Sequence, residues 1–326
     1  IILKNSAGVT QFDKDRIASL GSTQVQSFNN IAALRLSTGT TRANSAKTLG
    51  YYAAGDGGGN YFYWDSTSTA TDNGGSIIKP TSVGGAGRWI STESVFNPNM
   101  FGAKGDHNKD DTAYVIATIS ATSTNGSVVG RQNSTYRIST RVNLASKCIK
   151  DMVLSYSAGT ASLVLSGNSK LLNTTIYVNT TAPSFSSPLS GAVNLHLADG
   201  VIIDGLYIPD GSANSGIRIG IFCSTEANDV TVRNCKMDYI AWPLLYNDDT
   251  NFISRVVDGV DYAGSSIGRG LTVQNCSFGA LDKSQNGDGI EINCPDDRFT
   301  DVRVSGCIVN KAIGFAAHGA NGIGMG

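Results

Sequence analysis

The stretch Asn286–Asn293 carries two carboxyl groups, Asp288 and Glu291. A pair of carboxyl groups can act as general acid and general base, as in glycosidic-bond hydrolysis, where one donates a proton and the other activates water or attacks. If this stretch is a strand with Ile290 and Ile292 facing a core, Glu291 points to solvent and Asp288 falls on the opposite parity, as a turn residue. We take both as candidate catalytic residues, with ordinary solvated carboxylates as the alternative.

A third candidate is Arg218, which would place a positive charge near Glu291. Aligning Ile217 with Ile290 in a stack of parallel strands puts Arg218 in the same outward column as Glu291, two strands away. Two strand spacings are roughly 10 Å, so the two side chains can flank a sugar without forming a direct salt bridge. A cation beside a base is what elimination at a uronic acid requires, so hydrolysis and elimination both stay open.

Residues 241–249 combine aromatic rings with acids and amides. An apolar ring face stacks on a sugar ring while the sugar hydroxyls need polar partners, so this combination is typical of carbohydrate sites. The alternatives are that the tryptophan covers the core, or that the aromatics pack between subunits. The predicted carbohydrate-binding residues are Trp242, Tyr246, Asp248 and Asp249.

The overall charge excludes several kinds of partner. The 326 residues contain 25 Lys and Arg against 26 Asp and Glu, a formal net charge of −1, and no basic stripe that would bind a nucleic-acid backbone. No apolar run approaches the ~18 residues that span a bilayer, so we expect no membrane insertion. No Cys/His spacing indicates zinc, and we expect no metal and no cofactor. Because the chain lacks an initial Met and stops within a repeat, we expect a fragment of a longer protein.

A repeat must position these candidate residues. Only 16% of the chain is charged and it contains 38 Gly, which favours short strands and turns over helices. An apolar pattern at i, i+2, i+5 and i+7 recurs at intervals of 30, 29, 41 and 31 residues. Short strands with one buried face and a period near 30 predict parallel coils stacked into a solenoid. The extra residues of the long interval must form a loop, to which we assign residues 241–249. The repeats start at Leu171, Val201, Val230, Leu271 and Val302.

Three of the six cysteines, Cys235, Cys276 and Cys307, share one position of this repeat. They would stack inside the solenoid as small buried apolar side chains. Consecutive coils are close enough to allow a disulfide, but we expect a ladder of free thiols.

The residue pattern changes twice before the repeats begin. Residues 28–97 hold short β-prone runs and Asn-Gly turns, which predict a small antiparallel β module whose aromatic side chains fill its core. Asp110 and Asp111 then precede apolar residues at helical spacing, which predicts a helix capped by a carboxylate and ending near residue 125. The expected domains are an N-terminal segment at 1–27, the β-rich module at 28–97, and a solenoid at 98–326 with a capping segment at 98–125.

Two groups of motifs resemble known proteins. Phe101–Asp106 (FGAKGD) followed by Asp110–Ala113 (DDTA) resembles the opening signature of pectate-lyase-like right-handed β-helix domains. Gly50–Asp65, together with Asp72–Gly75 and Gly87–Trp89, resembles the module that precedes this domain in bacteriophage tailspikes. The resemblance implies an all-β fold, a right-handed parallel β-helix preceded by a small β-rich N-terminal module.

A tailspike resemblance over roughly residues 28–326 also implies partners and an activity. It implies a homotrimer that attaches to other virion tail or baseplate proteins through its N-terminal region, is located in the virion and is assembled in the host cytoplasm. The β-helix would bind and depolymerise host surface polysaccharide, capsule or lipopolysaccharide, as a glycoside hydrolase or a lyase. Tailspike catalytic groups can lie in later coils or between subunits, so the active site could lie beyond residue 326.

Two alternatives remain. One is a secreted pectate-lyase-like or polygalacturonase-like enzyme, because Asn286–Glu291 (NGDGIE) is similar to the polygalacturonase motif NTDGID and His318 faintly resembles part of its GHG motif. The aspartate pair Asp296–Asp297 follows too soon for that family, so we do not carry its active site over, and His318 is interpreted as a loop residue. The other alternative is an anchor and spacer without catalysis.

Overall fold

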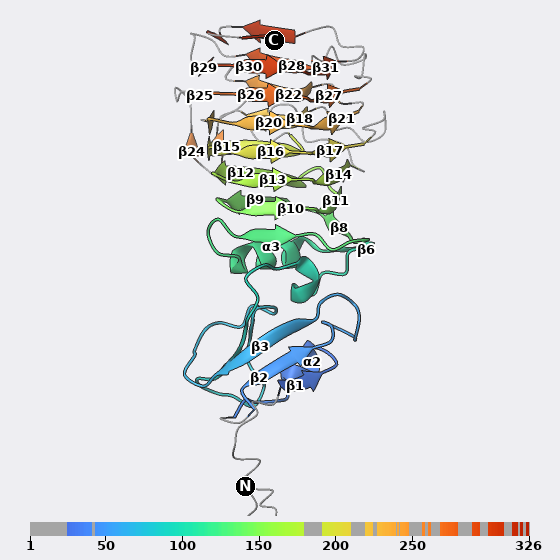
Figure 1. Cartoon of the computed structure of the whole chain (residues 1–326), viewed down its shortest axis with the longest axis vertical. Helices are drawn as coiled ribbons and strands as arrows, with labels where there is room; N and C mark the ends of the chain where they lie inside the picture. Colours follow the sequence, from blue (N-terminus) through green and yellow to red (C-terminus); the bar gives the residue numbers. More distant parts are fainter. Residues whose placement is uncertain are drawn as a thin grey trace, which may run out of the picture. The chain divides into compact units, whose positions relative to one another are not determined.

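In the computed structural model the chain divides into two compact units, Ile1–Glu93 and Ser94–Gly326, which we describe separately (Figure 1). No helix among the described residues has the length and apolar character needed to cross a membrane. The structure describes residues 25–40, 43–178, 191–209, 219–223, 227–238, 240, 242–247, 256–257, 260–261, 268–279, 289–293, 299–309, 315–318, 320–321 and 324–325.

Its described residues give the first unit a five-stranded sheet with the order β1-β2-β3-β5-β4 and one short helix. Neighbouring strands are antiparallel except β1 and β2, which are parallel. The predicted antiparallel module covered residues 28–97, and the pairs formed by β2, β3, β4 and β5 within it are antiparallel. β1 lies almost entirely before that range and is parallel to β2 because the helix between the two strands returns the chain to the same end of the sheet. The elements are β1 (Val25–Phe28), α2 (Ile31–Leu34), β2 (Ser45–Thr48), β3 (Asn60–Asp65), β4 (Ile77–Ile78) and β5 (Arg88–Ser91).

Aromatic and aliphatic side chains together form the core of this unit, and β3 contributes to it with one face. Phe62 is buried while Tyr61 and Tyr63 are 54% and 44% exposed, as the period of two in a strand requires. Trp64 and Trp89 pack edge to face, with ring centroids 5.2 Å apart. The buried core consists of Ile31, Leu34, Ala46, Phe62, Ile78 and Trp89.

Two aspartates organise the loops of the first unit. Asp56 accepts hydrogen bonds from the backbone N–H groups of Tyr51, Tyr52, Ala53 and Gly58. Burial alone would raise the pKa of Asp56, but the four N–H donors outweigh it and lower the pKa. Asp72 forms a bidentate pair with Arg35. Burial opposes that pair, yet the guanidinium and nearby backbone N–H groups hold the Asp72 pKa below its usual value.

The second unit is a parallel β-helix whose strands stack into three long sheets (Figure 1). Sheet 1 contains β7 (Ser127–Val129), β10 (Cys148–Lys150), β13 (Lys170–Leu172), β16 (Ile202–Asp204), β20 (Thr231–Arg233), β26 (Thr272–Gln274), β30 (Arg303–Ser305) and β34 (Gly324–Met325). Sheet 2 contains β6 (Asp106–Asp110), β8 (Thr135–Ile138), β11 (Val153–Tyr156), β14 (Thr175–Val178), β17 (Tyr207–Ile208), β21 (Lys236–Met237), β27 (Ser277–Phe278) and β31 (Ile308–Val309).

Sheet 3 completes each coil. The predicted all-β fold, in which a small β-rich module precedes a solenoid in the sequence, is therefore confirmed. It contains β9 (Arg141–Ala145), β12 (Ser162–Gly167), β15 (Val193–Asp199), β18 (Ile219–Cys223), β22 (Trp242–Asn247), β28 (Ile290–Asn293) and β32 (Phe315–His318). The remaining strands are β19 (Ala227–Asn228), which pairs with β15, the antiparallel pair β23 (Val256–Val257) and β24 (Val260–Asp261), and the short parallel sheet of β25 (Gly268–Arg269), β29 (Phe299–Thr300) and β33 (Ala320–Asn321).

The predicted repeat is correct for its last four units and wrong for the first. Ile203, Val232, Val273 and Val304 are aligned in sheet 1, as expected. Leu171, however, pairs with Ile203 rather than with Val201. The first interval is therefore 32 residues, because the inward positions that later coils fill with apolar residues are filled here by two fully buried polar residues, Ser169 and Thr174.

The three cysteines form the expected column of free thiols. Each thiol lies near a carbonyl of the preceding coil, at 3.8 to 3.9 Å from sulfur to oxygen. Hydrogen bonding to the thiol of Cys235, together with burial, raises the pKa of Cys276 to about 12. The column contains Cys235, Cys276 and Cys307.

A cap closes the start of the solenoid, and its details differ from the helix-capping prediction. The 3-10 turn η1 (Pro98–Phe101) and α3 (Thr112–Ala121) precede the first full coil, and the buried side chains of α3 join the solenoid core. Asp111 makes no capping hydrogen bond; its carboxylate accepts the N–H groups of Lys104 and Gly105 instead. Asp110 accepts the Thr112 N–H at 3.0 Å. The DD pair thus joins the FGAKGD loop to the helix start.

Candidate functional site

Two of the predicted site residues meet on the outer face of sheet 3. The indole Nε1–H of Trp242, on β22, donates a hydrogen bond of 2.5 Å to Oε2 of Glu291 on β28. Ile290 and Ile292 are buried, so Glu291 faces outward as the alternation predicted. The Trp242 ring also packs against the buried Phe222. An aromatic ring and a carboxylate therefore share one half-buried position.

The loop assignment of residues 241–249 was wrong for its central part. Trp242 and Tyr246 lie on β22, a regular strand of sheet 3, and Tyr246 is aligned between Cys223 and Ile292. The sequence gap that suggested a loop therefore opens after this strand, where β23 and β24 form an antiparallel pair. Asp248, Asp249, Asp288 and Arg218 lie outside the described residues.

The alignment that selected Arg218 was also wrong. Ile290 pairs with Leu244, and Leu244 with Ile221, so Ile290 is equivalent to Ile221 and not to Ile217. The outward column that ends in Glu291 accordingly contains Leu245 and Phe222 in the two preceding coils. A role for Arg218 beside Glu291 thus has no support from the register.

The Trp242–Glu291 pair is suited to bind a sugar and needs a further group to cleave one. An indole face stacks on the apolar face of a pyranose while a carboxylate accepts its hydroxyls. Hydrolysis needs a second carboxyl group, roughly 5 to 9.5 Å from the first depending on the stereochemical course. The predicted acids Asp288, Asp248 and Asp249 keep their status as predictions.

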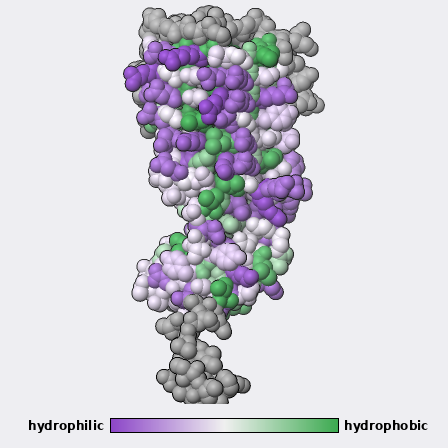
Figure 2. Space-filling model, in the orientation of Figure 1, coloured by the Kyte–Doolittle hydropathy of each residue, from purple (hydrophilic) through white to green (hydrophobic). Residues whose placement is uncertain are grey.

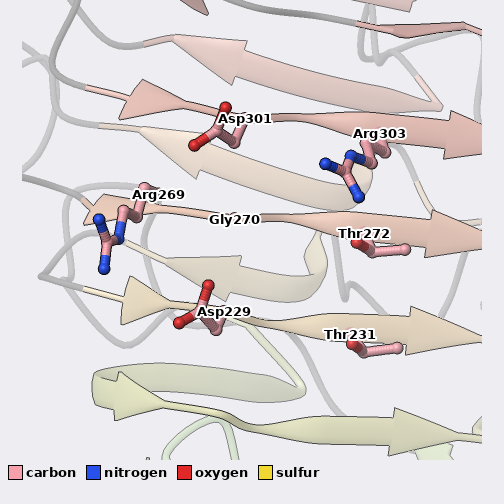
Figure 3. A pocket seen from close by; sticks show the side chains of 7 residues that line it. All are labelled: Asp229, Thr231, Arg269, Gly270, Thr272, Asp301 and Arg303. Carbon is pink, nitrogen blue, oxygen red and sulfur yellow. The ribbon is translucent and has the colours of Figure 1, made fainter.

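A second candidate site is a groove of about 410 Å³ on the outer face of sheet 1 (Figure 3). This volume lies within the ~300–1,000 Å³ typical of small-ligand sites. Two acidic, two basic and two hydroxyl side chains surround one glycine. The lining residues are Asp229, Thr231, Arg269, Gly270, Thr272, Asp301 and Arg303.

Three stacked coils supply this groove in regular rows. Thr231, Thr272 and Arg303 are register partners on β20, β26 and β30. Asp229 and Asp301 lie at the corner before these strands, one coil before and one coil after Gly270. Figure 3 shows the two carboxylates along the middle of the groove, with the Arg269 guanidinium on one side and that of Arg303 on the other.

The surroundings of this groove are strongly polar. In the view of Figure 2, hydrophilic residues cover much of the solenoid around β20 and β26, and these strands face the viewer in Figure 1. The described residues include no group of three or more His, Cys, Asp or Glu side chains placed to hold a metal ion. The groove offers charged and hydroxyl side chains for direct contact with polar groups of a ligand.

Sequence reasoning missed the groove although the repeat contained the signal. Asp229, Gly270 and Asp301 each stand immediately before a repeat start, and Thr231, Thr272 and Arg303 stand immediately after it. Writing the outward positions of the aligned repeats beneath one another brings all six together. The apolar pattern of the repeat covers only the inward positions, which determine the fold and do not reveal the groove.

Comparisons with known proteins agree with this architecture. Residues 27–94 match the family described as phage tail protein small four-stranded beta-sheet domain. The fold is similar to the tailspike gp49 of Acinetobacter baumannii bacteriophage Fri1, a capsular polysaccharide depolymerase, with 15% identity, a TM-score of 0.52, and coverage of 90% of this chain and 62% of that one. It is also similar to the gp42 tailspike of Acinetobacter phage vb_AbaP_AS12, with 12% identity, a TM-score of 0.61, and coverage of 93% and 56%.

These similarities establish a shared fold with phage tailspikes over most of this chain. The chain spans less than two thirds of the length of either tailspike. No curated protein sequence matches it.

Proposed function

We propose that this chain is the N-terminal part of a bacteriophage tailspike. Its first unit attaches the spike to the virion, and its solenoid binds and depolymerises a polysaccharide of the host surface. The observation that carries the proposal is the order of the two units: residues 27–94 match a phage tail domain, and a parallel β-helix with the fold of phage tailspikes follows directly. The alternative of a secreted pectin-degrading enzyme does not explain the first unit.

The outer surface of the solenoid supports the binding part of the proposal. Both the Trp242–Glu291 pair and the groove on sheet 1 present groups that bind sugar hydroxyls, and both lie on strands of the solenoid or at the corners directly before them. Side chains on packed strands are held in place more firmly than side chains on loops, which suits recognition of a repeating polymer.

In the same proposal the spike is a homotrimer that contacts other tail or baseplate proteins through residues 1–97 and is assembled in the host cytoplasm. Light scattering on the purified chain tests the first point. A trimer has a mass about three times 34.1 kDa, whereas a monomer of 34.1 kDa contradicts a trimer formed by this part of the chain.

Depolymerisation is tested on the purified chain with surface polysaccharides from a panel of encapsulated bacteria, whose size is followed by gel filtration. We expect the chain to bind and shorten at least one polymer. Glu291→Gln should slow shortening by about 10²-fold or more if Glu291 is a general acid or base, while the exposed Glu93→Gln, in the first unit, serves as the matched control.

The outcomes separate the alternatives. Shortening that is equal in both variants removes Glu291 from the chemistry. Binding without shortening leaves a binding and anchoring segment and contradicts a complete active site within residues 1–326. Binding to none of the polymers contradicts the proposed function of the solenoid.

A further inference from the structure

We propose that the groove on sheet 1 is a subsite for an anionic sugar residue, a uronic acid or an equivalent carboxylate-bearing sugar, within the polysaccharide. This inference rests on the proposed function and names the class of sugar that one part of the surface selects. It is argued from the floor of the groove, from its unpaired charges and from the kind of ligand that satisfies all of them.

Gly270 lines the groove without contributing a side chain to it. Gly270 has a φ of +76°, a left-handed conformation that glycine adopts without strain. A Cβ atom at this position would lie 2.4 Å from Oδ1 of Asp229. Asp229 and Asp301 are two coil steps apart, roughly 10 Å between their Cα atoms, and the glycine between them lets the Asp229 carboxylate lie in the groove over the Gly270 backbone.

The charged side chains of the groove are not paired with one another. Within the described part of the chain, no ion pair joins the exposed side chains of Asp229, Asp301, Arg269 and Arg303. Elsewhere on the same sheet, opposite charges do pair: Arg233 Nε donates to Asp204 Oδ2 at 2.8 Å.

Arg233 shows what such residues do on this surface when their role is structural. Its partner Asp204 also accepts a 2.8 Å hydrogen bond from the Asn234 side chain on the same coil as Arg233. These contacts fasten neighbouring coils together. The groove residues have the same kinds of charged group but form no ion pair with one another among the described residues, so their donors and acceptors can contact a ligand.

An anionic sugar satisfies both kinds of charge in the groove. A neutral sugar would leave two guanidinium groups without an anion, and a polyphosphate would be repelled by two carboxylates. A uronic acid offers hydroxyls to Asp229, Asp301 and the threonines, and a carboxylate that a guanidinium binds with two parallel hydrogen bonds. Because Arg303 and Arg269 stand on opposite sides of the carboxylates, an acidic group can be bound at either side.

The test uses the full chain and an array of surface polysaccharides from encapsulated bacteria, each printed in its native form and after chemical reduction of its carboxyl groups. We expect binding to carboxyl-bearing polymers that weakens at least tenfold on reduction. Arg303→Gln and Arg269→Gln should each weaken binding to the native acidic polymer at least tenfold. Arg233→Gln, the same substitution on the same sheet at a paired residue, should leave it unchanged.

The outcomes distinguish this inference from the proposed function. Binding that is indifferent to carboxyl reduction, or to both Arg303→Gln and Arg269→Gln, overturns the inference and leaves polysaccharide binding intact. Binding to neutral polymers alone does the same. Binding to no polymer overturns both. Equal melting curves for the three arginine variants exclude unfolding as the cause of a loss.

Discussion

Replacing Asp111 by Asn should destabilise the start of the solenoid although the two side chains have nearly the same shape. Asp111 is fully buried, and both of its carboxylate oxygens are used: Oδ1 accepts the Lys104 N–H at 2.7 Å and Oδ2 accepts the Gly105 N–H at 3.0 Å. An asparagine has one acceptor oxygen and an NH₂ group. In either orientation its NH₂ group therefore faces a backbone N–H, which loses its acceptor.

The expected loss follows from two opposing effects. A buried donor left without an acceptor costs about 1–3 kcal/mol. Against this, burial raises the pKa of Asp111 despite its N–H donors. The ionised carboxylate thus carries a penalty at neutral pH that the neutral amide removes. We expect a net loss of about 1–2 kcal/mol, which in a domain of this size lowers Tm by about 2–8 °C.

Asp106→Asn is the matched control because it makes the same change five residues before Asp111, at the start of β6. Asp106 is exposed, and its Oδ1 alone accepts both of its hydrogen bonds, from Asn108 and Lys109, at 2.9 Å each. The asparagine keeps that oxygen, so we expect no change beyond about 0.5 kcal/mol. Calorimetry at pH 7 on the two variants measures the difference. Equal Tm values for both variants would refute the reasoning.

Three further predictions concern other buried groups. Tyr136→Phe should lower stability by about 1–2 kcal/mol in denaturant unfolding, because the buried hydroxyl donates to Asn99 Oδ1 at 2.7 Å and its loss leaves that oxygen without this donor; an unchanged midpoint contradicts this. The folded pKa values of Asp56 and Asp72 are lowered, so their stabilisation of the first unit is present above their unfolded value of 3.8 and is lost as pH falls through the lower folded values; tryptophan fluorescence of thermal unfolding between pH 7 and pH 2 should show this loss. Cys276 should remain unmodified by a thiol reagent at pH 8 until the chain unfolds, because its pKa is raised to about 12 and it is buried; peptide mapping that finds it labelled in the folded protein refutes this.

The sequence predicted the face of each strand better than its register. Ile217, Ile219 and Ile221 alternate with other residues, so an alignment that slips by two or four residues still puts isoleucine inside. That is how Arg218 was aligned with Glu291 where the structure places Phe222. The outward direction of Glu291 was predicted correctly because a shift of the alignment by an even number of residues keeps each side chain on the same face. The same shift changes which residue of the adjacent coil lies beside it, so the predicted neighbour was wrong.

The first coil shows the complementary difficulty. Ser169 and Thr174 occupy fully buried positions that Val201 and Leu206 fill in the next coil. Ser169 can be buried because its hydroxyl reaches the carbonyl oxygens of Leu144 and Ser166, each at 2.6 Å. A search for apolar positions cannot recognise a polar residue whose partner is supplied by the preceding coil.

The aspartates of the groove stand at the corner before sheet 1, a position where the fold itself restricts the residue type. The chain there must adopt a left-handed conformation, with φ of 50° at Asp229, 76° at Gly270 and 58° at Asp301. Glycine, asparagine and aspartate are the residues that tolerate it best. The corner N–H groups of Asp229 and Gly270 donate to carbonyls of the next coil, at 2.8 and 2.9 Å.

The fold therefore accounts for a small or polar residue at these corners, but it does not account for a charge. Asparagine makes the same left-handed turn and keeps the backbone hydrogen bond, so Asp229→Asn and Asp301→Asn should preserve the coil. What they remove is the carboxylate that accepts a sugar hydroxyl. If the aspartates were only turn residues, these variants would bind polysaccharide like the wild type; as ligands in a subsite, they lose affinity without losing stability.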